Sequence, residues 1–333
     1  MKRITIIGAG SWGTALAIVA ARVGHEVRLW SRSPEVVRTI NELHTNPSYL
    51  VDAIIPSEVI ATGDLVAAIA DSSLLILAAP SHAARQLLTG ISKAVDANAI
   101  VVSAAKGIEL ETGQRISQIA QETLGPSMTS RFVCLSGPSF AKEVVGGSPT
   151  AIVAASNNNE AAREVQASLS FQNLRIYTNA DVVGTELGGS VKNVMAIAAG
   201  MTTGMGLGSN SVAALITRGL AEMSRLALHE GAQTETLMGL AGLGDLVLTC
   251  TGGLSRNRYV GEELGKGRTL AEITSGMNEV AEGIKTARAV KRLADKAKLE
   301  LPITNEVNAV LYDGKPVWEA VSELMRRPLR EEG

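Results

Sequence analysis

Short apolar runs alternate with helical stretches through the first half of the chain. The runs occupy residues 4–7, 27–30, 74–78, 100–103, 132–135 and 151–154. Continuous apolar runs of this length, separated by amphipathic helices, are typical of strands that are buried on both faces of a parallel sheet. We therefore predict an α/β protein whose N-terminal part, residues 1–180, is a Rossmann-type doubly wound sheet that binds a dinucleotide.

The pattern changes near Asp181, where the strand-like runs stop. Stretches with a 3.6-residue period follow at residues 211–229, 280–297 and 317–326, and Pro302 is placed as a first-turn residue of a further helix. We therefore expect an all-helical C-terminal domain over residues 181–333. The length of 333 residues agrees with two domains, because a single core rarely grows beyond about 250–300 residues.

Composition and charge narrow the class of partner. The formal net charge is −2, so the basic face that a nucleic-acid binder needs is not expected. Cys134 and Cys250 lie far apart with no His at ligand spacing, and they indicate neither a disulfide nor a metal site. The N-terminal apolar run is too short for a signal peptide, and no stretch reaches the roughly 18 apolar residues of a membrane span. We expect a cytoplasmic protein that binds a small molecule.

A glycine-rich turn follows the first apolar run. Gly8, Gly10 and Gly13 have the spacing of a dinucleotide-binding turn, and an Ala-rich helix is predicted over residues 14–23. In such a turn the first glycine allows the tight bend, the second lets the backbone approach a pyrophosphate, and the third lets the helix touch the strand. The alternative is an ordinary Gly-rich turn. The position of the turn between the first strand and the first helix favours a nicotinamide dinucleotide site.

The end of the second strand bears on which nicotinamide cofactor is used. An acidic residue at this point would bond the ribose hydroxyl of NAD(H) and repel the extra phosphate of NADP(H). The segment Leu-Trp-Ser-Arg-Ser at residues 29–33 contains no carboxylate, and Arg32 could pair with that phosphate. The alternative is that Arg32 is a solvated surface charge. The sequence therefore predicts that NADP(H) is accepted alongside NAD(H).

Polar or small residues follow three later strands, where ligands bind in open α/β sheets. The segments are residues 79–82, 105–107 and 136–141, and Lys106 in the second adds a positive charge near the expected nicotinamide end. Each segment taken alone could equally be a routine loop between a strand and a helix.

The helical half contains one lysine in unusual surroundings. Lys192 lies beside an apolar stripe and shares its helix face with Gly189, Ala196 and Ala199. Small neighbours would let another backbone or a ligand approach, and a desolvated lysine loses proton affinity and can act as a general base near neutral pH. A solvated lysine with no chemical role is the alternative.

Two further segments of the helical half carry charge. Asp245 stands among glycines and apolar residues, so a buried carboxylate would need a partner such as a lysine or a substrate hydroxyl; the alternative is a helix cap. Ser255, Arg256 and Asn257 precede a predicted helix and would present donors to a phosphate. A capped helix that faces solvent is the competing interpretation.

Taken together, these segments resemble the bacterial NAD(P)-dependent glycerol-3-phosphate dehydrogenases, from the first strand nearly to the C-terminus. The motifs that carry the resemblance are GAGSWGTALA, SAAKGIE, LSGPSFAKEV, ELGGSVKNVMAIAAG, GLGDLVLTCTG and SRNRYVGEEL. The implied reaction reversibly interconverts dihydroxyacetone phosphate and sn-glycerol 3-phosphate, which supplies the glycerol backbone for phospholipid synthesis. The cofactor would be NADP(H) or NAD(H), no metal would be needed, and a homodimer is expected.

The resemblance also implies roles for individual residues. Lys192 would be the proton acceptor, and Asp245 would orient it. Besides the three glycines of the turn, the implied cofactor contacts are Ser11, Trp12, Arg32, Lys106, Ala141, Arg256, Val280 and Glu282. The implied substrate contacts are Lys106, Gly137, Ser139, Lys192, Asp245, Ser255, Arg256 and Asn257.

Two other classes of protein stay open at this point. A dehydrogenase of the same architecture could act on another substrate, as a ketopantoate reductase or a 3-hydroxyacyl-CoA dehydrogenase does. The latter normally relies on a His/Glu pair, and His25, His44, His82 and His229 do not lie in a helical segment that resembles one. A dinucleotide-sensing regulator would keep the Gly-rich turn but would have no reason to carry Lys192, Asp245 and Arg256.

Overall fold

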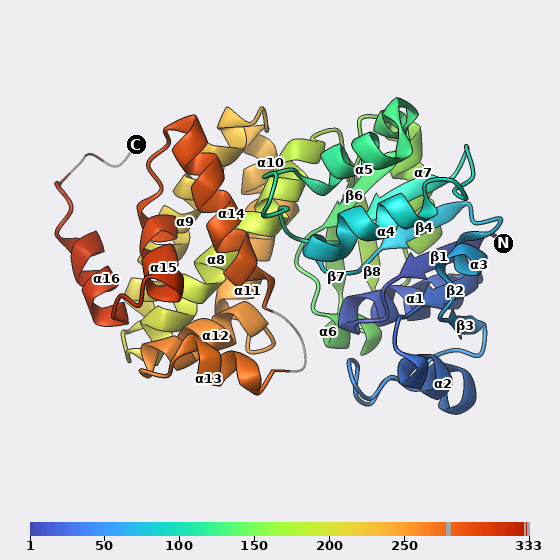
Figure 1. Ribbon diagram of the computed structural model, residues 1–333, viewed down its shortest axis with the longest axis horizontal. Coiled ribbons are helices and arrows are strands. Elements are labelled where there is room, and N and C mark those ends of the chain that lie inside the picture. Colours follow the sequence, from blue (N-terminus) through green and yellow to red (C-terminus); the bar gives the residue numbers. More distant parts are fainter. Residues whose placement is uncertain (278–280, 330, 332–333) are drawn as a thin grey trace.

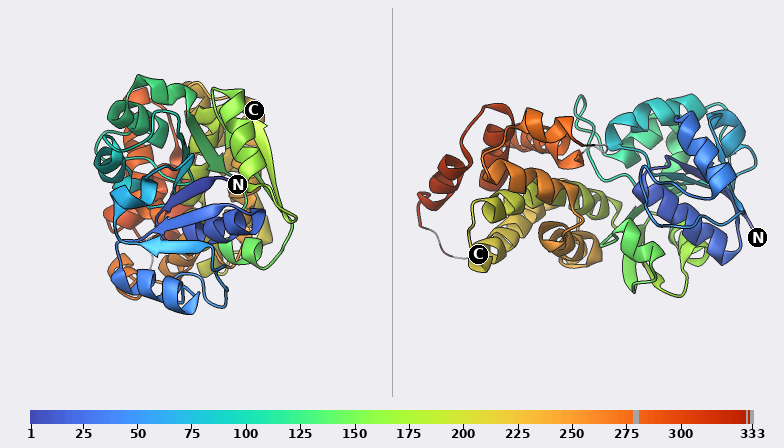
Figure 2. Two further views of the ribbon diagram at one scale, coloured as in Figure 1. Left: turned by 90° about the vertical axis from the view of Figure 1, so that its right-hand side faces the viewer. Right: turned by 90° about the horizontal axis from the view of Figure 1, so that it is seen from below.

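The protein is built from two units that lie side by side along its long axis (Figure 1, Figure 2). A computed structural model describes residues 1–277, 281–329 and 331. One unit is a sheet with helices on both faces and contains the N-terminus, and the other is helical. The predicted fold class, a Rossmann-type sheet followed by an all-helical part, is confirmed.

The sheet has eight strands in the order β3-β2-β1-β4-β5-β6-β7-β8. They are β1 (Arg3–Ile7), β2 (Glu26–Trp30), β3 (Val59–Thr62), β4 (Leu74–Leu77), β5 (Ile100–Ser103), β6 (Phe132–Ser136), β7 (Thr150–Ala155) and β8 (Leu174–Asn179). β1 lies between β2 and β4, so that Ile4 pairs with Val27 on one side and with Leu74 on the other. This is the crossover point at which doubly wound sheets bind their ligands.

One strand pair differs from the prediction. β6 and β7 are antiparallel, with Leu135 opposite Ala154, whereas the other neighbouring strands are parallel. The expectation of a parallel sheet is therefore wrong at this pair. A continuous apolar run reports that both faces of a strand are buried, but it does not report the direction of the strand.

The buried strands send alternate side chains to opposite faces of the sheet. In β4, Leu74 and Ile76 join the core under one layer of helices, and Leu75 and Leu77 join the core under the other. All four are at most 1% exposed. This two-sided burial explains why the central strands appear in the sequence as unbroken apolar runs.

The two edge strands were not predicted. Ile60 of β3 and Tyr177 of β8 are exposed, and the strands alternate between buried and exposed positions. Strands at a sheet edge have one side or face open to solvent, so their residues need not form a continuous apolar run. The six predicted strands are the better-covered members of the sheet.

Helices cover both faces of the sheet (Figure 2). One core includes residues of α1, α2, α6 and α7, and the other includes residues of α3, α4 and α5. The helical segments of this unit are α1 (Ser11–Val23), α2 (Pro34–Leu43), α3 (Leu65–Ile69), η1 (Ser81–Ala83), α4 (Ala84–Ile91), α5 (Ile116–Leu124), η2 (Pro126–Ser130), α6 (Ala141–Val145) and α7 (Asn159–Leu169).

The helical unit is arranged around one long helix, α8 (Val182–Gly204). Its other helices are α9 (Ser209–His229), α10 (Thr234–Met238), η3 (Leu240–Gly244), α11 (Asp245–Thr251), α12 (Arg256–Gly265), α13 (Leu270–Ser275), α14 (Glu282–Ala297), α15 (Pro302–Tyr312) and α16 (Val317–Met325). None of the described helices is long and apolar enough to cross a membrane.

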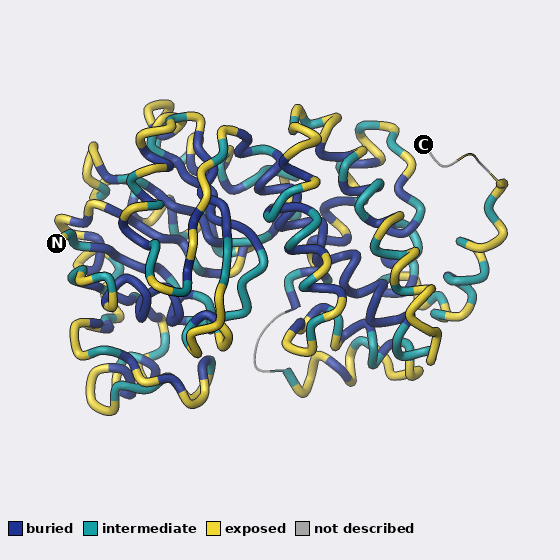
Figure 3. The backbone as a smooth tube through the Cα atoms, turned by 180° about the vertical axis from the view of Figure 1, so that it is seen from behind, coloured by how far each residue is buried: buried dark blue, intermediate teal, exposed yellow. Residues whose placement is uncertain are grey.

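The sequence suggested that one stripe of α8 is buried. In the structure the helix is buried on all sides. Residues from Gly184 to Thr202 are buried without interruption. α12 crosses α8 so closely that a side chain at Gly261 would collide with the carbonyl oxygen of Ile197. Figure 3 shows the buried chain running through the sheet and through the centre of the helical unit. Polar side chains on α8 are therefore held away from bulk water.

The two units are joined by a largely buried ion pair near the start of α8. Glu186 Oε2 lies 2.8 Å from Arg115 Nη1, and Glu186 Oε1 accepts a hydrogen bond from Ser117 N at 2.7 Å. Ser117 is in α5 of the sheet unit. These contacts fix the position of α8 relative to the sheet.

Candidate active site

The glycine-rich turn connects β1 to α1. Gly8 has a φ of +115°, and a Cβ at this position would lie 2.8 Å from Ala79 N. A Cβ at Gly13 would collide with the carbonyl oxygen of Gly8, so the helix touches the turn directly. Apart from Gly10 and its neighbours in the chain, no described atom lies within 4 Å of the Cβ position at Gly10, which leaves room there for another group. A pyrophosphate fits this turn, because the N–H groups at the start of α1 favour negative charge.

The segment between α2 and β3 holds the turn from outside. Asn46 Nδ2 donates to the carbonyl oxygen of Ala9 at 2.9 Å, and Ser11 Oγ donates to the carbonyl oxygen of Tyr49 at 2.6 Å. The indole Nε1 of Trp12 is buried and has no hydrogen-bond partner among the described residues. The turn and the first residues of α1 are thus fixed before any ligand binds.

Three further predicted cofactor contacts lie after β2, at the start of α6 and at the start of α14. Arg32 follows the carboxyl end of β2, and Ala141 is the first residue of α6, after β6. Glu282 begins α14 in the helical unit, where its Oε2 accepts from Ser81 Oγ at 2.8 Å and its Oε1 from Ser81 N at 3.1 Å. Val280 lies outside the described residues. The contact through Ser81 brings α14 to the loop that follows β4.

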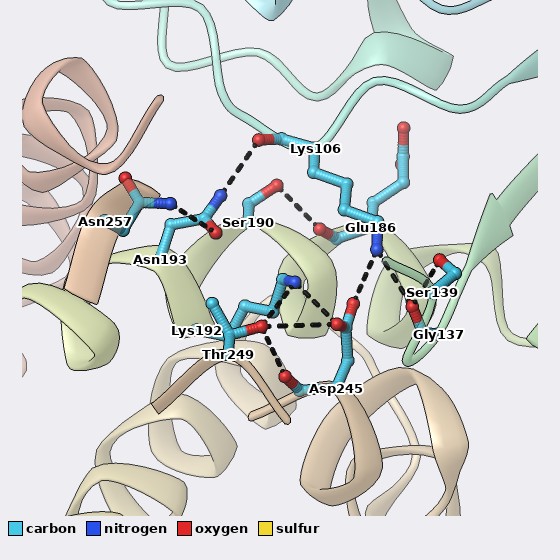
Figure 4. Close-up of polar contacts among 10 residues, drawn as sticks. All are labelled: Lys106, Gly137, Ser139, Glu186, Ser190, Lys192, Asn193, Asp245, Thr249 and Asn257. Carbon is cyan, nitrogen blue, oxygen red and sulfur yellow. Dashed lines mark hydrogen bonds and ion pairs between the residues drawn. The ribbon is translucent and has the colours of Figure 1, made fainter. Parts of the chain in front are cut away.

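Two lysines share one carboxylate at the junction of the units (Figure 4). Lys192 Nζ of α8 lies 2.5 Å from Asp245 Oδ1, and Lys106 Nζ of the loop after β5 lies 2.8 Å from Asp245 Oδ2. The side chains of Lys192 and Asp245 are only 7% and 1% exposed. Lys192 also donates to Thr249 Oγ1 at 2.8 Å. With both lysines protonated, the three side chains have a net charge of +1. Water is largely excluded from their surroundings.

The environment lowers the pKa values of both Lys192 and Asp245. Burial and the nearby charge of Lys106 lower the pKa of Lys192 to about 8, although Asp245 opposes the shift. Burial acts to raise the pKa of Asp245, but the two ammonium groups outweigh burial and hold that pKa below its usual value. Asp245 is therefore ionised near neutral pH, and Lys192 can exist in either protonation state.

Gly137 presents its backbone to this cluster. Its carbonyl oxygen accepts from Lys106 Nζ at 2.9 Å and from Ser139 Oγ at 3.0 Å. The φ of Gly137 is +138°, and a Cβ would lie 2.9 Å from Ile152 Cα, so a side chain is excluded by both strain and space. The loop after β6 thus supplies a fixed acceptor for Lys106.

A chain of amide hydrogen bonds runs from α14 to Lys106, and Figure 4 shows its part from Asn257 to Lys106. Gly283 N donates to Asn257 Oδ1 at 2.9 Å, and Asn257 Nδ2 donates to Asn193 Oδ1 at 3.0 Å. Asn193 Nδ2 then donates to the carbonyl oxygen of Lys106 at 3.3 Å. Three helices and the loop after β5 are therefore held in one arrangement around the lysines.

The predicted phosphate anchor lies at the start of α12. Ser255 is buried, and its Oγ accepts from Arg258 N at 3.2 Å, which is the capping role that the sequence left as an alternative. Arg256 is exposed and its charge acts on Glu282. The three anchor residues thus differ: Ser255 caps the helix, Asn257 belongs to the amide chain, and the charge of Arg256 acts on Glu282.

Several residues of the site were not identified from the sequence. Thr249 stands one helical turn after Asp245, which was a usable signal, because residues four apart share a helix face. Asn193 is adjacent to Lys192 in the sequence, but its bond to Lys106 joins segments that are 87 residues apart. The Ser81–Glu282 contact spans 201 residues and has no local signal. In the described part of the chain, no group of three metal-ligating side chains could hold a metal ion.

A dinucleotide-binding turn on a doubly wound sheet, joined to a buried lysine–carboxylate cluster, is the arrangement of a nicotinamide-dependent dehydrogenase. Comparison with known proteins agrees. Residues 3–162 match the family described as the NAD-dependent glycerol-3-phosphate dehydrogenase N-terminus, and residues 181–322 match the C-terminus of the same family. The chain belongs to the NAD-dependent glycerol-3-phosphate dehydrogenase family, and the resemblance seen in the sequence is confirmed.

Individual relatives cover nearly the whole chain. The chain is 52% identical over 330 residues to the glycerol-3-phosphate dehydrogenase (NAD(P)+) of Koribacter versatilis, with 98% of each chain covered. It is 48% identical to the corresponding protein of Geobacter sp. strain M21, covering 100% of this chain and 99% of the relative. The crystal structure of glycerol-3-phosphate dehydrogenase from Coxiella burnetii is similar with a TM-score of 0.94 and 40% identity, over 98% and 99% of the two chains.

Proposed function

We propose that the chain interconverts dihydroxyacetone phosphate and sn-glycerol 3-phosphate, with NADP(H) or NAD(H) as the second substrate, and that Lys192 transfers the proton. The observation that carries the proposal is the buried Lys192–Asp245–Lys106 cluster in a chain of this family. Reduction of a ketone needs a hydride at carbon and a proton at oxygen. The bound nicotinamide supplies the hydride, and the chain itself must supply the proton.

Lys192 is suited to move that proton in both directions. As an ammonium it donates to the C2 carbonyl oxygen while the ketone is reduced, and it becomes a neutral amine. In the reverse direction the neutral amine takes the proton of the C2 hydroxyl as hydride leaves C2. A pKa near 8 keeps both forms accessible.

Asp245 and Lys106 serve this transfer in different ways. Asp245 accepts from both lysines and thereby fixes the direction in which each ammonium points. The positive charge of Lys106, beside Lys192, favours negative charge that develops on the substrate oxygen. Gly137 and Ser139 hold the loop against which Lys106 rests.

Arg256 is proposed to bind the substrate phosphate, and Ser255 and Asn257 are proposed to hold Arg256 in position. A phosphate is bound well by an arginine at a helix start, because the guanidinium and the free N–H groups both favour negative charge. The net positive charge of the lysine cluster adds a longer-range attraction for a phosphorylated substrate.

The cofactor is proposed to lie along the Gly-rich turn. Its pyrophosphate would lie against Gly8, Gly10, Ser11, Trp12 and Gly13, and its two ends would reach the residues on the neighbouring loops, which are Arg32, Lys106, Ala141, Arg256, Val280 and Glu282. Support comes from the space at Gly10 and from the position of Arg32 after β2.

Further proposals rest on the family rather than on a contact. We place the division between the domains at residues 180 and 181, where β8 has ended and α8 is about to begin. We also propose that the protein is a homodimer in the cytoplasm and that its product, sn-glycerol 3-phosphate, enters phospholipid synthesis. Light scattering of the purified protein tests the dimer.

A substrate comparison tests the proposed reaction. Purified protein is mixed with NADPH and dihydroxyacetone phosphate, and the loss of reduced-nicotinamide absorbance is followed. Parallel reactions contain ketopantoate or an acetoacetyl thioester. Turnover with dihydroxyacetone phosphate is expected. Turnover with ketopantoate or the acetoacetyl thioester but not with dihydroxyacetone phosphate would overturn the proposal.

A further inference from the structure

Three basic side chains approach one another where α14 meets the sheet unit. Arg32 follows the carboxyl end of β2, His82 lies in η1 after β4, and Lys285 lies one turn into α14. β2 and β4 flank β1 in the sheet, so the loops after them border the Gly-rich turn on its two sides. Two of the basic groups thus come from the sheet unit and one comes from the helical unit.

The contact between Ser81 and Glu282 fixes the approach of α14. Ser81 donates to the two carboxylate oxygens of Glu282 at 3.1 Å and 2.8 Å. A Cβ at Gly107 would lie 2.7 Å from Glu282 Oε2, so the carboxylate also packs against the loop that carries Lys106. Lys285 lies three residues after Glu282, on the same side of α14, and His82 directly follows Ser81. The two hydrogen bonds therefore hold Lys285 near His82.

The charges of these groups act on one another. Partial burial lowers the pKa of His82, and the positive charges of Lys285 and Arg32 lower it further; Glu111 opposes them with the weakest effect. Among the described residues, neither Arg32 nor Lys285 forms an ion pair or a hydrogen bond, and both are exposed. Basic groups that gather without a bonded carboxylate favour an anion between them.

We propose that Arg32, His82 and Lys285 together bind the phosphate monoester that NADPH carries on its adenosine ribose, so that the helical unit helps to select NADPH over NADH. The proposal rests on the proposed function, because it assigns the three residues to the cofactor of that reaction. Arg32 and Lys285 supply charged donors to phosphate oxygens, and the neutral imidazole of His82 supplies one ring N–H. NADH has a hydroxyl group at this position and gains little from the positive charges.

A pair of lysine variants on one helix tests the proposal. Lys285→Ala removes the proposed contact, and Lys296→Ala removes an exposed lysine three turns further along α14 as the matched control. KM is measured for NADPH and for NADH with saturating dihydroxyacetone phosphate. Lys285→Ala is expected to raise KM for NADPH by about three- to tenfold and KM for NADH by less than about twofold. Lys296→Ala should change neither value, and His82→Gln should act as Lys285→Ala does, with a smaller change.

A binding measurement separates this proposal from the reaction itself. Calorimetry with adenosine 2′,5′-bisphosphate should show about three- to tenfold weaker binding to Lys285→Ala than to the unaltered protein, with equal binding of AMP. Unchanged binding of the bisphosphate, or equal changes for both nucleotides, would overturn the proposal. If dihydroxyacetone phosphate is not turned over with either cofactor, the proposed function fails, and the calorimetric comparison still decides the role of Lys285.

Discussion

The Gly-rich turn after β1 and the lysine cluster beside α8 differ in whether the backbone or the side chains form the site. At the turn, the backbone forms the site: Gly8 and Gly13 are required because a side chain at either would collide with neighbouring backbone. At the cluster, the side chains of Lys192, Asp245 and Lys106 form the site. Backbone N–H groups can bind the pyrophosphate of any dinucleotide, whereas an ionisable group with a shifted pKa is suited to proton transfer.

The two regions also differ in what their formation requires. The turn adds no ionised side chain to the interior. The cluster places a nearly inaccessible carboxylate and a nearly inaccessible lysine together, which is tolerated only because each has charged or hydrogen-bonding partners. Substitutions in the cluster should therefore affect stability and chemistry together, and substitutions near the turn should affect cofactor binding.

Removal of the shared carboxylate should have the largest effect. Asp245→Ala leaves two lysines close together, one of them buried, without their common partner, and we expect the free energy of unfolding to fall by about 3–5 kcal/mol. Denaturant unfolding of both proteins at pH 7 measures the change. The matched control is Asp295→Ala, which breaks the exposed pair with Lys291 and should cost less than about 1 kcal/mol. Equal losses in the two variants would contradict the account of the cluster.

Arg256→Ala should weaken the binding of the phosphorylated substrate. A charge-assisted bond to phosphate contributes about 1.5–3 kcal/mol, so KM for dihydroxyacetone phosphate should rise by about ten- to a hundredfold. Steady-state rates with saturating NADPH measure it. Arg258→Ala is the control on the same helix, because Arg258 pairs with Glu262. If dihydroxyacetone without a phosphate loses as much as the phosphorylated substrate, Arg256 does not bind the phosphate.

A change at the end of β2 should alter cofactor preference. Arg32→Asp replaces a positive charge with a negative one beside the proposed ribose phosphate, so KM for NADPH should rise by about ten- to thirtyfold. KM for NADH should change much less, because a carboxylate can bond the ribose hydroxyl. Both values come from initial rates at saturating dihydroxyacetone phosphate. Parallel changes for the two cofactors would show that Arg32 is only a surface charge.

The two directions of the reaction should depend on pH in opposite ways. The pKa of Lys192 is lowered to about 8, so the neutral fraction rises about tenfold between pH 7 and pH 9. Oxidation needs the neutral amine, and its kcat should rise over this interval. Reduction needs the ammonium, and its kcat should fall. Initial rates in both directions across pH 6–10 measure this, and profiles of the same sign in both directions would contradict proton transfer by Lys192.

The central part of the fold was predictable, and its edges were not. Leu74–Leu77 lies inside the sheet and is apolar at every position, so burial is visible in the sequence. Tyr177 of β8 lies at an edge and faces solvent, and its strand lacks that pattern. The antiparallel direction of β7 depends on how its connections pass over the sheet, which local residue patterns do not encode.

Individual residues of the site could be predicted from the sequence more readily than the contacts between them. The isolated carboxylate of Asp245 predicted a charged partner or a substrate hydroxyl, and the structure places Lys192 against it. The second lysine, Lys106, comes from the other unit, 139 residues away in the sequence. Such pairs result from the packing of the two units, for which a single sequence contains no local signal.

The measurement that tests the central claim most directly is the comparison of turnover and cofactor binding in Lys192→Ala. We expect kcat for the reduction of dihydroxyacetone phosphate to fall by at least about a hundredfold, because a positioned acid contributes about a hundred- to ten-thousandfold. The Kd for NADPH, measured by fluorescence titration, should stay within about twofold, because the Gly-rich turn is unchanged. Turnover close to that of the unaltered protein, in a variant that is folded and binds NADPH, would contradict the assignment of the proton transfer to Lys192.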